Sequence, residues 1–401
     1  MSEPVAYLVG GARTPMGKYG GALAAVRPDD LAALVVAEAL TRAGIDGSVP
    51  GTVDEVVLGA ANQAGEDNRN VARMAVLLAG LPETIPGYTV NRLCASGLTA
   101  VASAAQAVRC GDANVVVAGG VESMTRAPWV MAKPGTPWAR PGEVADTALG
   151  WRLVNPRMPQ LDGGRATITL GETAEEVAVL DGIAREESDA FGLRSHRRAV
   201  AAIEAGRFEP EIVPVETPAG AVKVDEGPRA STDLDKLARL KPSFRRDGIV
   251  TAGSSSPLSD GAAAIVVASE DAVRRYGLQP RARVVAAASA GVRPSLMGLG
   301  PVPATEKVLE RAGWTTGDLD AVELNEAFAV QAIACIRRLG LDDEIVNADG
   351  GAIALGHPLG CSGTRLLVTL LGRLESGGGT RGLATLCVGV GQGVSMLVEL
   401  V

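Results

Sequence analysis

Apolar runs of strand length alternate with helical patterns along the first 125 residues. Strand-like runs lie at residues 5–9, 53–59, 88–93 and 115–120, and helical patterns lie at 29–43 and near 68–79. Short apolar runs bounded by turn residues are typical of buried strands, and apolar positions at helical spacing indicate helices with one covered face. The alternation predicts an α/β fold in which helices cover a sheet.

The pattern changes between residues 126 and 248. This stretch holds a cluster of prolines and three of the four tryptophans, and charged helical patterns follow around 172–206. After Thr251 the alternation returns, with further helices expected near 304–312 and at about 326–339. We predict a first core half at 1–125 plus 249–275, an inserted loop domain at 126–248, and a second core half at 276–401.

Two stretches of the predicted core are versions of one another. VNRLCASG opens a helix that is followed by the strand run ANVVVAGGV, and VNADGGAIALGHPLGCSG opens a helix that is followed by LATLCVGVG. A duplicated α/β unit explains both stretches. Two copies are too few for a solenoid, so we expect the halves to pack face to face as one body.

Composition narrows the function classes. The 401 residues are 47% hydrophobic and 3% aromatic, and their formal net charge is −8 without a block of Lys and Arg, which disfavours nucleic-acid binding. No apolar run reaches the roughly 18 residues of a membrane span, and no basic targeting stretch is present, so we expect a cytoplasmic protein without a membrane partner. The five cysteines form no CxxC pair, which predicts neither a disulfide framework nor a metal site.

Cys94 lies where a strand-like run meets a helix, between YTVNRL and a first turn that contains Ser96 and Gly97. The positive end of a helix dipole favours thiolate over thiol, and the small neighbours leave space for a substrate carbonyl and for backbone N–H groups at an oxyanion. The alternative is a buried core thiol, the usual role of an unpaired cysteine.

The two histidines differ in their surroundings. His196 lies in the charged stretch RSHRRA, which predicts a solvated surface residue. His357 lies in GGAIALGHPLGCSG, where Pro358 fixes the turn and the glycines make room for something bulky. His357 is therefore a candidate acid–base group, against the alternative of a structural histidine.

Two further candidates follow strand runs. Cys387 ends an apolar run that continues into VGVGQG, and its alternative is a buried strand thiol. Asn325, in ELNEAFA, is placed either to cap a helix or to orient a water or a carbonyl. Ligands bind at strand ends in open α/β sheets, so Cys94, His357, Cys387 and Asn325 are expected to share one site. We take the remaining cysteines as structural: Cys110, Cys335 and Cys361.

These segments together resemble the thiolase family along essentially the whole chain. The matching pieces are NRLCASGL (91–98), AGGVESMTRAP (118–128), TAGSSSPLSDGAAA (251–264), LNEAFA (324–329), NADGGAIALGHPLGCSG (347–363) and LCVGVGQG (386–393). The resemblance implies a five-layered αβαβα sandwich of two similar halves, with an inserted loop domain that binds coenzyme A. It also implies a homodimer or homotetramer that uses coenzyme A and acyl-CoA as substrates, with no permanently bound cofactor.

The resemblance also implies roles for the candidate residues. Cys94 is the nucleophile that carries the acyl group, and His357 takes its proton and helps to form an oxyanion site that a water on Asn325 completes. Cys387 is the acid–base group for the attacking carbon or thiol. The N–H groups of Cys94 and Gly389 form a second oxyanion site. A thiolate suits such a reaction because it is both a good nucleophile and a good leaving group.

Four more residues match substrate contacts of the family. Ser256 and Arg229 fall where family members touch the pantetheine and nucleotide ends of coenzyme A. Met297 and Phe328 match positions that line the acyl pocket of short-chain members, although a Met and a Phe at such spacing are more often core residues.

Some segments point to a subgroup. VGVGQG and GWRLVNPRM (150–158) resemble β-ketoadipyl-CoA thiolases, whereas QLDGGRATITLG (160–171) and the SSP of TAGSSSPLSDG depart from them. A dicarboxyl acyl chain requires a cation, for which Arg157 and Arg165 are candidates, against the alternative of solvated loop arginines.

The sequence therefore predicts an acetyl-CoA C-acyltransferase that works through a Cys94 thioester, cleaving 3-oxoacyl-CoA with coenzyme A or joining two acyl-CoA units. Fatty-acid β-oxidation and 3-oxoadipyl-CoA degradation are the expected settings. The alternatives are a short-chain biosynthetic acetoacetyl-CoA thiolase, a condensing enzyme of the ketoacyl synthase type, and a non-catalytic acyl-CoA carrier. Ketoacyl synthases use two histidines, or a histidine and an asparagine, so Cys387 argues against that class.

Overall fold

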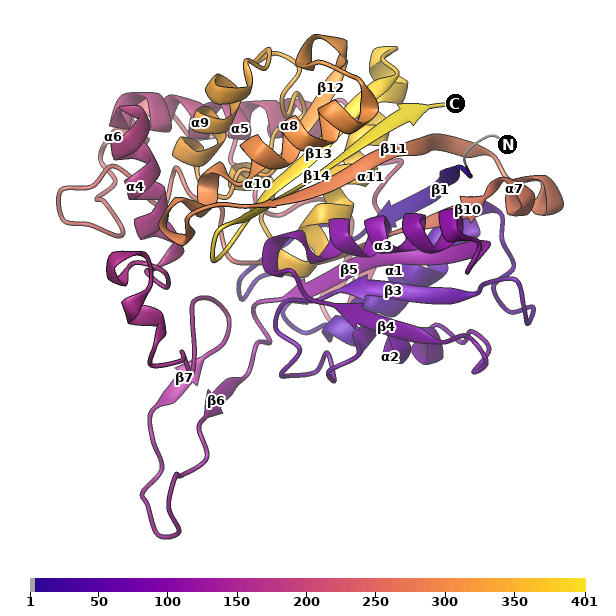
Figure 1. Ribbon diagram of the computed structural model, residues 1–401, viewed down its shortest axis with the longest axis horizontal. Coiled ribbons are helices and arrows are strands. Elements are labelled where there is room, and N and C mark those ends of the chain that lie inside the picture. The colour runs from indigo at the N-terminus through magenta and orange to yellow at the C-terminus, as the bar shows by residue number, and fades with distance from the viewer. Residues whose placement is uncertain (1–3) are drawn as a thin grey trace.

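The computed structural model describes residues 4–401; residues 1–3, which belong to the predicted first half, lie outside the described residues. A ten-stranded sheet with two wings forms the centre of the molecule (Figure 1). In the first wing the order is β4 (Gly87–Val90), β3 (Glu55–Gly59), β5 (Val115–Ser123), β10 (Ser259–Ser269) and β1 (Ala6–Arg13), with the short β2 (Gly17–Lys18) on β10. In the second it is β11 (Pro280–Gly291), β14 (Gln392–Leu400), β13 (Arg381–Val388) and β12 (Ala321–Leu324). Antiparallel pairing of β1 with β11 joins the wings.

Helices form three layers around the two wings. Helices α1 (Pro28–Ala43) and α2 (Val71–Leu78) pack on the outer face of the first wing. Helices α3 (Ser96–Cys110) and α11 (Leu359–Gly377) lie between the wings, and α8 (Pro301–Ala312) and α9 (Ala329–Leu339) pack on the outer face of the second. The predicted αβαβα sandwich of two similar halves is confirmed.

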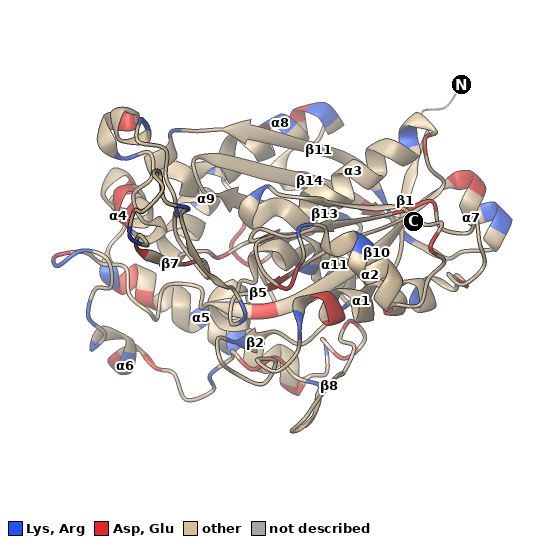
Figure 2. Cartoon of the chain, turned by 90° about the horizontal axis from the view of Figure 1, so that it is seen from below, with Lys and Arg blue, Asp and Glu red and all other residues tan. Residues whose placement is uncertain are grey.

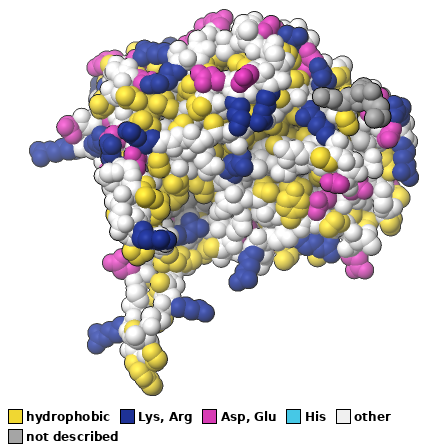
Figure 3. All heavy atoms as spheres, viewed as in Figure 1, with side chains coloured by type: hydrophobic (Ala, Val, Ile, Leu, Met, Phe, Trp, Pro, Cys, Tyr) yellow, Lys and Arg dark blue, Asp and Glu magenta, His cyan; other side chains and the backbone are white. Residues whose placement is uncertain are grey.

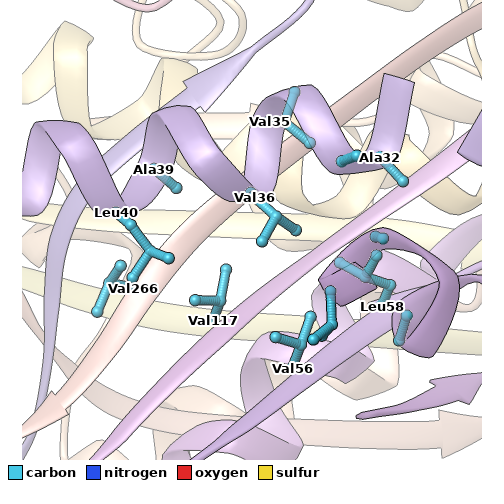
Figure 4. Packing of buried hydrophobic residues seen from close by; sticks show 14 of the residues in the cluster. Ala32, Val35, Val36, Ala39, Leu40, Val56, Leu58, Val117 and Val266 are labelled. Carbon is cyan, nitrogen blue, oxygen red and sulfur yellow. The ribbon is translucent and has the colours of Figure 1, made fainter. Parts of the chain in front are cut away.

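The sheet is apolar on both faces because both faces are covered. Along β10, Val266 packs in the cluster under α1, whereas its neighbours Ile265 and Val267 pack in the middle layer with α3 and α11. Alternate residues of a strand point to opposite faces, so a continuous apolar run serves two layers at once. Figure 4 shows Val36 and Leu40 of α1 above Val266 and the β5 residue Val117.

The chain between residues 126 and 248 lies over one side of this core. Its strands form two separate two-stranded sheets, and β6 and β7 belong to an arm that projects from the body in Figures 1 and 3. The elements are β6 (Trp129–Met131), β7 (Val144–Asp146), α4 (Leu170–Asp181), α5 (Arg185–Glu204), β8 (Val215–Thr217), β9 (Gly220–Val222) and α6 (Leu234–Ala238). The division into two core halves and an inserted loop domain, with boundaries at residues 126, 249 and 276, stays a prediction.

Basic and acidic residues are interspersed along the chain, as Figure 2 shows.

The structure differs from two expectations drawn from the sequence: the start of the helix near residue 326 and the exposure of His196. The helix expected from about 326 begins at Ala329, because Phe328 has an extended backbone with φ −145° and stands at its N-cap. His196 is buried, so its prediction as a solvated residue is wrong. Its ring Nδ1 accepts the backbone N–H of Arg229 at 3.2 Å, and burial lowers its pKa to about 4. Arg229, which contacts His196, is more than thirty residues further along the chain. The local charge pattern around His196 therefore does not reveal that this side chain is buried.

The first turns of α3 and α11 cross in very close contact. A Cβ on Gly97 would lie 2.7 Å from the Gly360 carbonyl oxygen, and a Cβ on Gly363 would lie 2.3 Å from the Leu98 nitrogen. These glycines make room for another helix. The expectation that Gly97 leaves space for a substrate is therefore wrong, and what Gly360 and Gly363 accommodate is the protein's own backbone.

Among residues 4–401, no helix combines the length and the apolar character needed to cross a membrane.

We predict that Gly363→Ala lowers the free energy of unfolding by about 1–3 kcal/mol, because the added methyl group forces the two central helices apart. Gly372→Ala is the matched control on the same helix, since its nearest atom would be 3.9 Å away. There the removal of a helical glycine stabilises by about 0.5–1 kcal/mol. Urea unfolding of both variants measures the difference. Equal stability of the two variants would contradict the tight crossing.

Candidate active site

One cavity of about 320 Å³ brings together most of the residues singled out in the sequence, and Asn325 lies behind its lining, with its Nδ2 3.3 Å from His357 Nε2. Cys94, His357, Cys387 and Gly389 all line it, and so do the three predicted substrate contacts Ser256, Met297 and Phe328. The residues come from both wings: Cys94 lies in the turn that leads into α3, His357 lies between α10 (Ala352–Leu355) and α11, and Cys387 belongs to β13. The cavity therefore lies where the two wings meet, at the ends of their strands and central helices.

A short 3₁₀ turn, η1 (Leu93–Ala95), presents Cys94. Leu93 has a positive φ of 46°, a conformation that is uncommon for a residue with a side chain. The Ser96 hydroxyl holds the turn, because it accepts the Arg92 N–H at 2.8 Å and donates to the Leu93 carbonyl at 2.7 Å. The strained backbone is thus fixed by local hydrogen bonds directly beside the sulfur.

Burial dominates the electrostatics of Cys94. It raises the pKa of the thiol to about 11, while the backbone N–H groups of Gly389 and of Cys94 itself act in the opposite direction. The position at a helix start alone favours the thiolate, so the direction of the pKa shift differs from the sequence expectation. Removal of the sulfur from water outweighs the dipole. The resting group is a thiol that faces two N–H donors.

Cys387 lies close enough to Cys94 for the two sulfurs to interact electrostatically. Burial raises the pKa of Cys387 above its usual value, and the negative charge of a Cys94 thiolate raises it further. All five cysteines are free, so these two thiols share a cavity without being joined. Cys110 is exposed and Cys335 and Cys361 are buried within α9 and α11, apart from this cavity lining.

Hydrogen bonds define the tautomer of His357. The Ser362 hydroxyl donates to the Pro358 carbonyl at 2.9 Å, so at 2.6 Å from His357 Nδ1 it accepts the Nδ1–H. His357 Nε2 then carries the lone pair, 3.3 Å from Asn325 Nδ2. Burial, with a smaller contribution from the positive charge of Arg365, lowers the pKa of His357 to about 3. The imidazole is neutral, and its unprotonated Nε2, which accepts the Asn325 side-chain N–H, is the nitrogen able to take up a proton.

Asn325 does not cap a helix, since α9 begins four residues later. Its backbone N–H bonds to the Thr385 carbonyl at 3.0 Å, which ties the residue to β13. Its Oδ1 is buried and, within residues 4–401, has no hydrogen-bond partner. A buried amide oxygen in this condition is suited to hold a water or a donor group of a ligand.

Three of the four predicted substrate contacts line the cavity, and the fourth does not. Ser256 donates its hydroxyl to the Ala327 carbonyl at 3.1 Å, and the Phe328 ring packs edge-on against Phe244 with a centroid distance of 6.0 Å. Arg229 is exposed, and the structure does not bring it to the cavity. Its predicted contact with the nucleotide end of coenzyme A stays a prediction.

Glu122, a buried carboxylate at the end of β5, is a site residue that was not predicted from the sequence. One of its oxygens accepts the N–H groups of Ala61 and Gly360, both at 2.9 Å, and the other accepts the Asn62 N–H at 3.1 Å. Burial raises the pKa of Glu122 to about 7. Glu122 thus anchors a loop of the first wing to the start of α11. Its place within the motif AGGVESMTRAP was the one indication in the sequence. The role of Glu122 could not be predicted from that motif, because its hydrogen-bond partners are distant along the chain.

Comparison with known proteins agrees with this geometry. The family model "Thiolase, N-terminal domain" matches residues 6–271, and "Thiolase, C-terminal domain" matches residues 278–400. The chain is 52% identical to the 3-oxoadipyl-CoA/3-oxo-5,6-dehydrosuberyl-CoA thiolase of Escherichia coli (strain K12) over 99% of each chain. It is 53% identical to the beta-ketoadipyl-CoA thiolase of Pseudomonas aeruginosa over 100% of each.

Solved structures give the same result. The Bacillus anthracis acetyl-CoA acetyltransferase superposes with a TM-score of 0.92 at 42% identity over 100% of both chains. The human mitochondrial 3-ketoacyl-CoA thiolase in complex with CoA has a TM-score of 0.92 at 38% identity, over 99% of this chain and 98% of that one. The chain belongs to the thiolase family, and the resemblance drawn from its motifs is confirmed.

We predict that the rate of iodoacetamide alkylation at Cys94 keeps rising with pH beyond pH 9, because burial holds the pKa of this thiol near 11 and only the thiolate reacts. Mass spectrometry of the labelled peptides gives the rate at each pH. The exposed Cys110 provides the reference profile in the same sample. A Cys94 rate that levels off at or below pH 8 would contradict the thiol resting state.

Proposed function

We propose that this chain is an acetyl-CoA C-acyltransferase that transfers acyl groups by a ping-pong mechanism through a Cys94 thioester. The observation that carries the proposal is the convergence of Cys94, His357, Cys387 and Gly389 on one cavity. Coenzyme A and acyl-CoA enter as substrates, and the reaction uses no permanently bound cofactor.

In the first half-reaction Cys94 attacks the 3-oxo carbon of a 3-oxoacyl-CoA. The thiol proton passes to His357 Nε2 as the sulfur–carbon bond forms, which removes the need for a stable thiolate in the resting enzyme. The N–H groups of Cys94 and Gly389 receive the oxyanion at this carbon. The bond between the second and third carbons then breaks, and the departing acetyl-CoA leaves as an enolate.

The enolate is stabilised and protonated by the remaining groups. Its thioester oxygen accepts hydrogen bonds from protonated His357 and from a water held by Asn325, whose buried Oδ1 has no partner among residues 4–401. The Cys387 thiol gives its proton to the carbon. A thiol with a raised pKa remains protonated at neutral pH, as this step requires.

In the second half-reaction the thiol of coenzyme A attacks the acyl-enzyme. Cys387 takes the proton of the attacking thiol, and the thioester oxygen occupies the site made by the N–H groups of Cys94 and Gly389. The Cys94 sulfur then leaves and takes back its proton from His357, which restores the resting thiol and the neutral imidazole. Run in reverse, the same steps condense two acyl-CoA units.

We propose 3-oxoadipyl-CoA as the substrate, which coenzyme A cleaves to succinyl-CoA and acetyl-CoA. Relatives with this activity in their names share about half of all positions over the whole chain.

We further propose that the enzyme is a cytoplasmic homodimer or homotetramer. Trp129 and Trp138 lie in the arm formed by β6, β7 and the chain between them, and their exposed apolar side chains support an assembly, which light scattering tests.

We predict that Cys387→Ala still acquires acetyl on Cys94 from acetyl-CoA but cleaves and condenses at least 10²-fold more slowly, because the carbon acid has lost its proton partner. Mass spectrometry of the quenched protein locates the adduct, and a thiol-release assay gives the rate. Cys94→Ala is the control that abolishes both adduct and turnover. Turnover by Cys94→Ala would contradict the mechanism and favour a non-catalytic role for the cavity.

A further inference from the structure

A second cavity, of about 250 Å³, also reaches Cys94. The two cavities are continuous and share six lining residues: Cys94, Leu149, Gly150, Leu170, Leu359 and Gly389. Beyond these, the first holds His357 and Cys387, and the second holds Asn62, Trp151 and Arg152. The first cavity holds the acid–base groups, together with Ser256, which matches a pantetheine contact, and Met297 and Phe328, which match acyl-pocket positions of short-chain members. The second cavity offers further room beside Cys94 for the distal part of a longer acyl chain.

Arg152 is the one basic residue among the described residues that line this second cavity. Its guanidinium contacts Asn62, with Nη2 3.1 Å from Oδ1 and 3.4 Å from the backbone oxygen. Within residues 4–401 it forms no salt bridge, so its charge meets oxygen dipoles instead of a carboxylate. A half-buried guanidinium in this condition is able to form a charge-assisted pair with an anionic ligand group.

The loop that carries Arg152 is held firmly against the site. Trp151 donates its ring N–H to the Ile168 carbonyl at 3.2 Å, and its ring packs so closely on Gly389 that a Cβ there would lie 2.9 Å from it. Arg152 is therefore fixed relative to the N–H groups at the Cys94 sulfur. A fixed spacing between nucleophile and cation selects the length of an acyl chain as well as its charge.

Glu122 also lines this cavity and carries the opposite charge. Both of its oxygens accept backbone N–H groups, from Ala61, Asn62 and Gly360, and burial raises its pKa to about 7. These donors occupy its oxygens and offset its charge.

The loop arginines expected from the sequence do not reach the site: Arg165 pairs with Glu176 at 2.9 Å, and Arg157 is exposed outside both cavities.

We propose that Arg152 binds the distal carboxylate of a dicarboxyl acyl chain and so selects 3-oxoadipyl-CoA over uncharged 3-oxoacyl-CoA. This inference rests on the proposed function. In the acyl-enzyme the succinyl group on Cys94 extends along the second cavity, with its thioester oxygen at the Cys94 and Gly389 N–H groups and its carboxylate at Arg152. The residue acts on binding and specificity, and the bond-making steps stay with Cys94, His357 and Cys387.

The test compares 3-oxoadipyl-CoA with 3-oxohexanoyl-CoA, which has the same chain length and a methyl group in place of the carboxylate. For Arg152→Met we expect the ratio of kcat/KM for the two substrates to fall about 10- to 100-fold, the usual effect of losing a hydrogen-bonded charge partner. Arg152→Lys is expected to recover part of the ratio. Arg157→Met, in the same loop, is the control whose ratio equals that of the unchanged enzyme.

The outcomes separate this inference from the proposed function. An equal fall for both substrates would show that Arg152 only supports Asn62, and an unchanged ratio would show that the carboxylate binds elsewhere; either result overturns the inference and leaves the acyl transfer intact. Cleavage of 3-oxohexanoyl-CoA without cleavage of 3-oxoadipyl-CoA by the unchanged enzyme would overturn both the carboxylate site and the proposed substrate. Absence of cleavage of either would overturn the proposed function itself.

Discussion

The close crossing of the first turns of α3 and α11 is the constraint on which the site depends. Each helix belongs to a different half of the duplicated core, and each begins beside one of the reacting groups, Cys94 or His357. Glycine at Gly97 and Gly363 lets the backbones approach to distances that no side chain would permit. The helix starts therefore meet, and two residues more than 260 positions apart face one cavity. The duplication of the fold thus has a direct chemical consequence.

The burial that this packing produces also sets the protonation states. It keeps Cys94 a thiol and His357 a neutral imidazole, and it keeps Cys387 protonated. In the proposed reaction, charge appears only when substrate is attacked, and fixed N–H donors then stabilise it. Such preorganised donors are effective in a dry site because they need no rearrangement when the charge develops.

The sequence predicted much of the fold and the central residues of the site, for different physical reasons. Hydrophobic periodicity located β5 and α1 because both faces of the sheet are covered. Cys94, His357 and Cys387 were found because they stand at strand or helix ends among glycines. What the sequence did not reveal depends on distant contacts: the burial of His196, the helix contact of Gly97, and the place of Arg152 beside Cys94. The direction of the Cys94 pKa shift was missed for the same reason, since burial is a property of the whole fold.

We conclude that Cys94 carries the acyl group, that its own N–H group and that of Gly389 receive the acyl carbonyl oxygen, and that His357 faces the same cavity. A crystal structure of Cys387→Ala after reaction with acetyl-CoA tests it most directly. We expect an acetyl group on Cys94 Sγ whose carbonyl oxygen accepts hydrogen bonds from the N–H groups of Cys94 and Gly389, with His357 Nε2 facing the same cavity. An acetyl group on another residue, or a carbonyl oxygen directed away from these N–H groups, would contradict it.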